Sequence, residues 1–264
     1  MNKSKMLLDA TQSCNSVQDI KKLSDGIQVE EYPEFCKLLE SDERKAIRQL
    51  ITRLTRKFES HEKERLRMRK IFEYEKAAQS KGYLLIAGID EAGRGPLVGP
   101  VVAGAVVLDQ SVDWTGIDDS KKLSEEKRNF FYEKIVKHAI SYGVGMASHD
   151  EIDEINILNA TKLAMARALE SVSADFLLID AVKLTDIPIE QISIIKGDSL
   201  SASIAAASII AKVTRDRMLL ELHEAYPMYD FKNNKGYGTE SHYKAIREFG
   251  IINEHRKSFL KNIL

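Results

Sequence analysis

Acidic residues follow the apolar runs of this chain at the points where strands would end. Asp90 and Glu91 come directly after LLIAGI, and Asp180 comes directly after FLLI. Asp198 follows ISIIKG and immediately precedes an alanine-rich helical pattern. In an open α/β sheet, ligand-binding groups gather outside the carboxyl ends of the strands. These four acids are therefore candidates for one site, although their spacing alone does not show that they converge in space.

Carboxylates brought together in this way favour the binding of divalent cations. Burying them is costly unless cations neutralise their charge, and oxygen ligands suit Mg²⁺ or Mn²⁺. Two such ions about 3.5–4 Å apart can hold a phosphodiester for in-line attack by water, one activating the water and the other stabilising the leaving oxygen. That chemistry needs a bridging acid with further acids on either side, which is the set found here.

Each acid, taken singly, also has a structural explanation. An Asp between a strand and a helix is more often an N-cap than a metal ligand. Asp198, followed by Ser199 and Ser201, fits the N-cap pattern well. The case for a metal site therefore depends on the acids acting together and on the segments around them.

A glycine-rich segment, GIDEAGRGPLVGPVVAGAVV, surrounds the first two acids. Glycine lets the backbone approach a phosphate closely, and backbone N–H groups in such loops can bind anions. Arg94 adds a guanidinium suited to phosphate oxygens. No GK[ST] follows, and Pro96 and Pro100 interrupt any helix, so the loop matches neither a Walker A motif nor a dinucleotide fingerprint. A nucleotide-binding enzyme is accordingly the weakest alternative.

The elements that must position these residues change character near residue 80. Before it, the spacing predicts a short helix over 16–23 and helical periodicity from Glu34 to about Phe58, followed by a charge-dense stretch to Ala78. After it, apolar strands at 83–89, 101–108, 140–146, 176–179 and 191–195 alternate with helical patterns at 124–139, 156–172, 201–226 and 239–249. Two early strands followed by this alternation predict an α/β fold in which helices flank a mixed sheet. We expect a helical, charged N-terminal extension over 1–80 and the site-bearing domain, with C-terminal helices, over 81–264.

The overall charge gives no sign of a nucleic-acid partner, but its distribution does. The chain of 264 residues has a net charge of −1, whereas nucleic-acid binders usually carry a basic surplus. Residues 44–70 nevertheless hold eleven Lys or Arg and form a local basic segment. The alternative is a solvated helical face, on which Glu62, Arg65 and Arg69 are spaced to pair.

Several other function classes are disfavoured. Cys14 and Cys36 form no CxxC motif, the six histidines are dispersed, and we therefore expect neither a disulfide framework nor a zinc site. The first fourteen residues lack the apolar core of a signal peptide, and no run of about 18 apolar residues occurs. These features predict a cytoplasmic protein without a membrane partner.

Five blocks of this sequence resemble ribonuclease HII, the bacterial type 2 ribonuclease H, and they occur in that family's order. They are GIDEAGRGPLVGPVVAGAVVL (88–108), DDSKKLSEEKR (118–128), LLID (177–180), KGDSLSASIAAASIIAKVTRDR (196–217) and KGYGT (235–239). Type 3 enzymes carry a different glycine-loop pattern without this GRG. Val98 stands where bacterial members commonly have alanine, a departure that we expect to alter packing and not chemistry.

The resemblance implies a ribonuclease H-like fold and assigns roles to particular residues. It identifies Asp90, Glu91, Asp180 and Asp198 as the catalytic and metal-binding acids. It implies that the Gly93, Arg94 and Gly95 loop contacts the phosphate and 2′-hydroxyl at an RNA-to-DNA junction. It also implies that Tyr237 stacks on the sugar of the following deoxynucleotide and that Ser120 and Lys121 contact the phosphate backbone. From the residues alone, Tyr237 can equally be an ordinary packed loop aromatic, and Lys121 a solvated lysine.

The activity implied is hydrolysis of the RNA strand of RNA–DNA hybrids and nicking on the 5′ side of ribonucleotides embedded in duplex DNA. The resemblance implies 3′-hydroxyl and 5′-phosphate ends, two Mg²⁺ or Mn²⁺ ions bridged by Asp90, and a role in ribonucleotide excision repair. We expect a monomer, and the C-terminal RKSFLKNIL shows no clear clamp-binding motif. The role of residues 1–80 is open, and the basic segment suggests that they strengthen substrate binding.

Two further readings stay open. One is a two-metal nuclease of the same fold that acts on DNA junctions or on continuous hybrids only. The other is a nucleic-acid-binding module whose acids are only helix caps, although the presence of all four acids argues against it.

Overall fold

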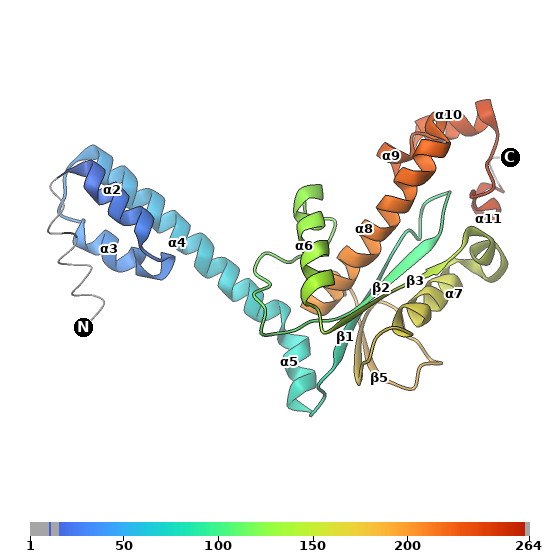
Figure 1. Ribbon diagram of the computed structural model, residues 1–264, viewed down its shortest axis with the longest axis horizontal. Helices are drawn as coiled ribbons and strands as arrows, with labels where there is room; N and C mark the ends of the chain where they lie inside the picture. The colour runs from blue at the N-terminus through green and yellow to red at the C-terminus, as the bar shows by residue number, and fades with distance from the viewer. Residues whose placement is uncertain (1–10, 12–15, 262–264) are drawn as a thin grey trace. The chain divides into compact units, whose positions relative to one another are not determined.

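The computed structural model describes residue 11 and residues 16–261 (Figure 1). The chain forms two compact units, Met1–Arg69 and Lys70–Leu264. Cys14, and residues 1–10, 12 and 13 on which most of the signal-peptide prediction rests, lie outside the described residues. Among the described helices, none is long and apolar enough to cross a membrane.

The first unit is helical, as the periodicity predicts. Helices α2 (Val17–Gly26) and α3 (Tyr32–Leu38), with a 3₁₀ turn η1 (Val29–Glu31) between them, precede the long helix α4 (Lys45–Ile71). Ser16 begins α2 with a capping box completed by Asp19. A small core fills this unit, made by Ile20, Tyr32, Phe35, Leu39, Ile47, Leu50 and Leu54.

The helical periodicity predicted from Glu34 to Phe58 is broken in the structure. Helix α3 ends at Leu38, and α4 begins only at Lys45. Asp42 explains the break, because its carboxylate accepts hydrogen bonds from the backbone N–H and the guanidinium of Arg44. Asp side chains that bond to nearby backbone in this way compete with helix formation.

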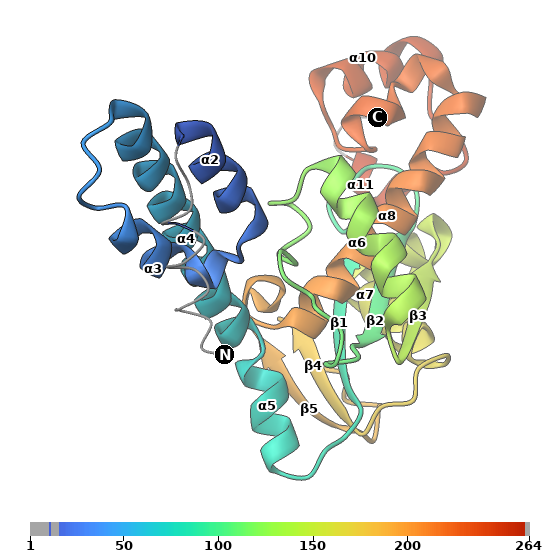
Figure 2. The same cartoon turned by 60° about the vertical axis from the view of Figure 1, so that its left-hand side comes forward.

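The second unit contains a five-stranded mixed sheet in the order β3-β2-β1-β4-β5, which confirms the predicted fold class (Figure 2). Strands β1, β2 and β3 pair antiparallel, whereas β1, β4 and β5 pair in parallel. The strands are β1 (Ile86–Ala92), β2 (Val101–Val107), β3 (Ser141–Ala147), β4 (Phe176–Asp180) and β5 (Glu190–Ile194).

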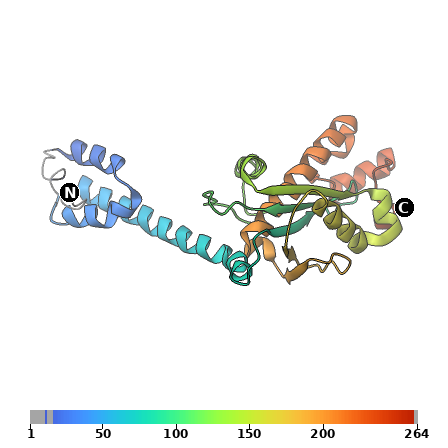
Figure 3. The same cartoon turned by 60° about the horizontal axis from the view of Figure 1, so that its bottom comes forward.

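Two long helices pack against opposite faces of this sheet (Figure 3). Helix α8 (Ala202–Ala225) approaches so closely that a Cβ on Gly88 would lie 2.0 Å from the Ser203 carbonyl carbon. On the other face, a Cβ on Gly145 would lie 2.0 Å from the Ala164 oxygen of α7 (His149–Leu169). Small residues on both partners therefore allow the backbones to meet, as the alanine-rich start of α8 predicts.

The remaining helices of this unit are α5 (Glu73–Ser80), α6 (Glu125–His138), α9 (Phe231–Asn234), α10 (Glu240–Phe249) and α11 (Lys257–Leu260), with the short 3₁₀ turns η2 (Gly197–Ser199) and η3 (Pro227–Tyr229). Ser124 caps α6 as predicted, and Gly250, with φ of 82°, ends α10.

The predicted starts of β1 and α7 differ from the structure. Strand β1 starts at Ile86 and not at Tyr83, because the N–H groups of Leu84 and Leu85 bond to the Asp175 carboxylate. Helix α7 starts at His149, seven residues before the predicted start at Asn156. Ser148 and Glu151 form a capping box there, while Asn156 is a kink with φ of 65°.

Candidate active site

The first two acid-bearing strands lie side by side and run in the same direction. Their register pairs Gly88 with Leu178 and Ile89 with Ile179, and the next residues along the strands are Asp90 and Asp180. Because side chains alternate between faces, both aspartates fall on the face of Gly88, which α8 covers. The parallel pairing therefore brings together two acids that are 90 positions apart in the sequence.

Asp198 joins them from the segment before α8. It lies in the 3₁₀ turn Gly197–Ser199, and the N–H of Gly197 donates to Asp180 Oδ1 at 2.8 Å. The N-cap of α8 is Ser201, whose hydroxyl accepts from the Ile204 N–H. The explanation of Asp198 as the N-cap of this helix is therefore wrong, and its carboxylate is available to the site.

A buried acid from α5 strengthens the same helix start. Glu75 Oε1 accepts from the Ser201 hydroxyl at 2.7 Å and from the Ser203 N–H at 2.9 Å. Burial raises the pKa of this carboxyl group, while its hydrogen bonds to Ser201 and Ser203 oppose the rise. The helix start that follows Asp198 is thus fixed by a residue that the sequence did not single out.

Electrostatic repulsion marks the acids as one cluster. Burial, followed by the charge of Glu91 and then that of Asp180, raises the pKa of Asp90 well above its usual value. Burial also raises the pKa of Glu91, although Arg94 opposes it. The pKa of Asp198 is raised by burial and then by Asp119 and Asp180. Asp180 acts on each of the other three, so all four carboxylates share one electrostatic environment.

The donor set fits divalent metal ions, and the individual contacts show how. All four side chains offer carboxylate oxygens, and Glu91 Oε2 is buried without a hydrogen-bond partner among the described residues. Within that part of the chain, no three acids, histidines or cysteines are arranged to hold an ion as they stand. Mg²⁺ commonly keeps several waters and uses only one or two carboxylates, so this arrangement suits partly hydrated ions.

The two residues after Asp119 play different parts. Lys121 is exposed, and its Nζ lies 3.7 Å from Asp198 Oδ2. Ser120 is only 2% exposed, and its hydroxyl bonds to Ser208 Oγ at 2.9 Å. Ser208 in turn hydrogen-bonds Asp90. The structure thus places Lys121 at the open edge of the acid cluster and the Ser120 hydroxyl behind it.

The glycine loop (residues 93–100) and the tyrosine loop (residues 235–239, which include Tyr237) meet next to the acids. Arg94 is exposed, with its NH1 3.4 Å from Glu91 Oε1. A Cβ placed on Gly95 would lie 3.4 Å from Cε1 of Tyr237, whose side chain is 48% exposed. Tyr237 therefore stands against the glycine loop and is about half exposed to solvent.

Comparison with known proteins agrees with this arrangement. The family model "Ribonuclease HII" matches residues 87–262, and the model "Ribonuclease HII N-terminal domain" matches residues 16–79. The chain belongs to the ribonuclease HII family. Members of this family cleave RNA in RNA–DNA hybrids and at embedded ribonucleotides, so the chain is a nuclease of the ribonuclease H type.

Relatives match over almost the whole chain. Ribonuclease HII of Clostridioides difficile is 50% identical over 251 residues, covering 94% of this chain and 98% of that protein. Ribonuclease HII of Bacillus cereus strain Q1 is 51% identical over 246 residues, covering 92% and 95%. The N-terminal helical extension is therefore shared with these relatives.

Solved structures share the fold of the second unit. Ribonuclease H2 of Pyrococcus horikoshii superposes with a TM-score of 0.59 at 26% identity, covering 68% of this chain and 97% of its own. Ribonuclease HII of Archaeoglobus fulgidus, solved with PCNA, gives 0.56 at 28% identity, covering 66% and 94%. A ribonuclease HIII solved with Mn²⁺ gives 0.50 at 19% identity, covering 69% and 67%, which shows the fold alone.

Sequence reasoning missed the residues that support the two loops. Arg215 donates to the carbonyls of Val98, Pro100 and Lys235, and Arg256 donates to carbonyls of the glycine loop. Arg215 lies within the block VTRDR, but nothing in a lone arginine signals that it is buried. Val98 is itself fully buried against Gly236.

Proposed function

We propose that this ribonuclease HII family member hydrolyses the phosphodiester on the 5′ side of a ribonucleotide in duplex DNA, leaving 3′-hydroxyl and 5′-phosphate ends. The observation that carries the proposal is the closeness of the acid cluster to the loops. Glu91 contacts Arg94 directly, and Tyr237 stands against Gly95. A nucleotide bound between these loops would present its phosphate to the carboxylates.

The four acids would hold two divalent ions, Mg²⁺ or Mn²⁺, with Asp90 as the bridging ligand. When bound, such ions supply an activated water and stabilise the leaving oxygen. The protein keeps Asp90 in place through the N–H of Glu91, which donates to Asp90 Oδ1 at 2.8 Å, and through Ser208. Ser120 supports Ser208 from behind, so we assign Ser120 a positioning role and Lys121 the contact with the phosphate backbone.

Recognition of the ribonucleotide falls to the glycine loop. No hydrogen bond among the described residues uses the backbone N–H of Gly93, Arg94 or Gly95. Free N–H groups in a glycine loop can bind a phosphate or a 2′-hydroxyl, the group that distinguishes RNA from DNA. Arg94 adds a charged partner for the phosphate, and Tyr237 offers its exposed ring to the next sugar.

The test is incubation of the purified protein, with Mg²⁺ and separately with Mn²⁺, with a DNA duplex containing one ribonucleotide. We expect a metal-dependent nick on the 5′ side of the ribonucleotide and no cut in an all-DNA duplex. Cleavage of a continuous RNA–DNA hybrid alone would favour the nuclease restricted to hybrids. Binding without cleavage of any substrate would favour the binding module.

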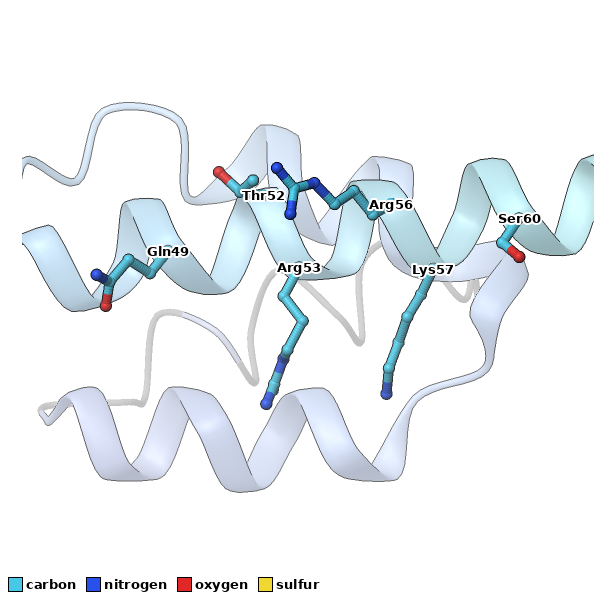
Figure 4. A pocket seen from close by; sticks show the side chains of 6 residues that line it. All are labelled: Gln49, Thr52, Arg53, Arg56, Lys57 and Ser60. Atoms are coloured by element: carbon cyan, nitrogen blue, oxygen red, sulfur yellow. The ribbon is translucent and has the colours of Figure 1, made fainter.

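We also propose that the basic face of α4 strengthens substrate binding. Arg53, Arg56 and Lys57 are exposed and form no ion pair with another described residue, whereas Arg65 pairs with Glu62 at 2.7 Å. A hollow of about 530 Å³ runs along this face, and Figure 4 shows its lining residues, which are Gln49, Thr52, Arg53, Arg56, Lys57 and Ser60. Cations with interleaved hydroxyl and amide groups suit a nucleic-acid backbone.

Charge removal tests this second proposal better than truncation. A truncation beginning near Gln79 would also remove Glu75, whose carboxylate accepts hydrogen bonds from the first residues of α8. The triple variant Arg53→Gln/Arg56→Gln/Lys57→Gln should bind hybrids more weakly, with a shallower dependence of log Kd on log salt. A matched variant, Lys21→Gln/Lys22→Gln/Lys37→Gln, also removes three positive charges, but from exposed positions on α2 and α3. Equal salt slopes in the two variants would contradict the proposal.

A further inference from the structure

One buried arginine donates hydrogen bonds to four carbonyl groups of the glycine loop. Arg256 is 0% exposed. Its Nε donates to the Gly99 oxygen at 2.9 Å, NH1 donates to the oxygens of Arg94 and Pro96 at 3.0 and 2.8 Å, and NH2 donates to the Gly93 oxygen at 2.6 Å. Four peptide groups of one loop are thus oriented by a single planar guanidinium.

This orientation decides which groups the loop offers to a ligand. A peptide group whose carbonyl points inward carries its N–H on the opposite side. The carbonyls of Gly93 and Arg94 share their peptide groups with the N–H groups of Arg94 and Gly95, and neither of these N–H groups forms a hydrogen bond among the described residues. Without Arg256, buried carbonyls would lose their donors, at about 1–3 kcal/mol for each unsatisfied group, and the peptide groups would be free to turn.

A pair of buried histidines holds the tyrosine loop. His242 and His255 are both 0% exposed, and their Nε2 atoms are 3.1 Å apart. His242 Nδ1 lies 2.9 Å from the Tyr237 carbonyl oxygen, so it must carry the proton and donate. The Ile252 N–H donates to His255 Nδ1, so His255 Nε2 carries its proton and donates to His242 Nε2. Every ring nitrogen of the pair therefore has one defined role.

The C-terminal segment ties these two supports together. Arg256 follows His255 directly, and the Arg256 N–H donates to the Leu97 oxygen at 2.8 Å. The Gly99 N–H donates to the Glu254 oxygen, and Val98 forms an isolated β-bridge with His255. The Leu97 N–H in turn donates to the Gly236 oxygen of the tyrosine loop. Residues 252–256 thus form a common anchor for both loops.

We propose that Arg256 and the His242–His255 pair are positioning residues that set the selectivity for a ribose-to-deoxyribose junction. Arg256 directs the N–H groups of Arg94 and Gly95 toward the ribonucleotide, and the histidine pair holds Tyr237 at a fixed distance from that loop. This inference rests on the proposed roles of the glycine loop and Tyr237. Neither support touches the carboxylate cluster in the described contacts, so the hydrolytic step itself is left intact when one of them is altered.

Two substitutions of the same histidine test the proposal. His242→Asn keeps an amide donor near the position of Nδ1 and so retains the bond to the Tyr237 carbonyl. His242→Gln places its amide near Nε2 and releases that carbonyl. We measure kcat and KM on a duplex with one ribonucleotide and on a continuous RNA–DNA hybrid. Binding of the single-ribonucleotide duplex and of all-DNA duplex is measured separately by fluorescence anisotropy in EDTA.

For His242→Gln, we expect the ratio of kcat/KM on the single-ribonucleotide duplex to kcat/KM on the continuous hybrid to fall by about 10-fold or more, since small misplacements of positioned groups have effects of this size. Most of this fall should come from a higher KM on the single-ribonucleotide duplex. Its kcat on the continuous hybrid should stay close to that of the wild type. His242→Asn should keep most of the wild-type ratio. A purely structural role would lower activity on both substrates equally, and an unchanged ratio in His242→Gln would overturn the proposal.

Arg256→Lys gives an independent test of the proposal, which remains available if His242→Gln does not fold. An ammonium group is a point charge with three donors and cannot reproduce the planar fork. The wild type should bind the single-ribonucleotide duplex more tightly than all-DNA duplex. We expect this difference in affinity to disappear in Arg256→Lys and to stay unchanged in Arg247→Lys, which alters an exposed position of α10. Retained discrimination in Arg256→Lys would also overturn the proposal. If the wild type itself fails to nick at a ribonucleotide, the proposed function fails, a result distinct from either outcome.

Discussion

Two groups of charged residues, the four acids and a pair of buried arginines, lie next to the glycine loop. They differ in how far the protein supplies their hydrogen-bond partners. Three of the four acids in the cluster have pKa values raised by burial and mutual repulsion, and Glu91 Oε2 has no partner among the described residues. The arginine group consists of Arg215 and Arg256. Burial lowers their pKa values to about 10 and about 9, yet between them they donate to carbonyl groups of both loops.

This difference distinguishes the acid cluster from the arginine group in the role that each can play. Buried charges are normally paired or hydrogen-bonded, and a group that is neither calls for a ligand. In the acid cluster, Glu91 Oε2 has no such partner among the described residues, whereas the protein's own backbone supplies hydrogen-bond partners to both arginines. We infer that the first group carries the chemistry and the second fixes the geometry of recognition.

The largest effect is expected from the acid cluster itself. Asp90→Asn should reduce turnover by orders of magnitude while leaving substrate binding largely intact, because it removes the proposed bridging ligand. Mg²⁺ should also raise the unfolding temperature of the wild type more than that of the variant, since the ion binds the folded state. Single-turnover kinetics, anisotropy and thermal unfolding check this. Asp186→Asn, at an exposed position, is the control, and near-normal activity of Asp90→Asn would remove Asp90 from the chemistry.

Acid should weaken the recognition scaffold through His255. Burial, followed by the charges of His242 and His149, lowers the pKa of His255 to about 4. The unfolded state therefore binds more protons between about pH 6.5 and pH 4, and the stability contributed by neutral His255 is lost as pH falls through that window, by up to about 3 kcal/mol. Denaturant unfolding of the wild type and His255→Gln should give a stability difference that shrinks with falling pH. A pH-independent difference would contradict this prediction.

Gly93 tests how tightly the arginines pack against the loop. Its φ is +94°, and a Cβ there would lie 2.1 Å from Arg215 Nε. Gly82 has φ of +98°, but a Cβ placed on it would have nothing within 4 Å, so the two positions differ in packing and not in backbone strain. We expect Gly93→Ala to destabilise the protein by about 1–3 kcal/mol more than Gly82→Ala, measured by denaturant unfolding. Equal losses would show that Arg215 moves aside freely.

A smaller effect is expected from Arg94, an exposed arginine whose guanidinium contacts Glu91 and whose carbonyl accepts a hydrogen bond from Arg256. Arg94→Ala should raise KM on a single-ribonucleotide duplex by about 10-fold, the scale of one hydrogen bond to a charged group. Its kcat should change little, because Arg94 is not one of the acids. Arg247→Ala, an exposed arginine on α10, serves as the control. Unchanged kinetics in Arg94→Ala would count against its contact with the phosphate.

Local patterns in the sequence predicted most of the fold. Strands β2, β4 and β5 lie within a residue or two of the predicted ranges, and Ser124 caps α6 as its position indicates. Two errors occur where a side chain competes for backbone groups, as Asp42 does after α3 and Asp175 does before β1, and a third occurs at the capping box that starts α7. Of these, only the Asp175 contact joins distant parts of the chain, so only that error needed the folded protein to reveal it.

The sequence by itself determined the family and the order of elements, and it singled out the four acids as the candidate site, because caps, periodicity and motif blocks are local properties of the chain. Only the tertiary structure decided that Ser201 and not Asp198 caps α8, and that the Ser120 hydroxyl turns inward to Ser208. It alone brought Arg256 to the Gly93 carbonyl across 163 positions. A contact at that separation depends on how distant elements pack, and no local pattern encodes it.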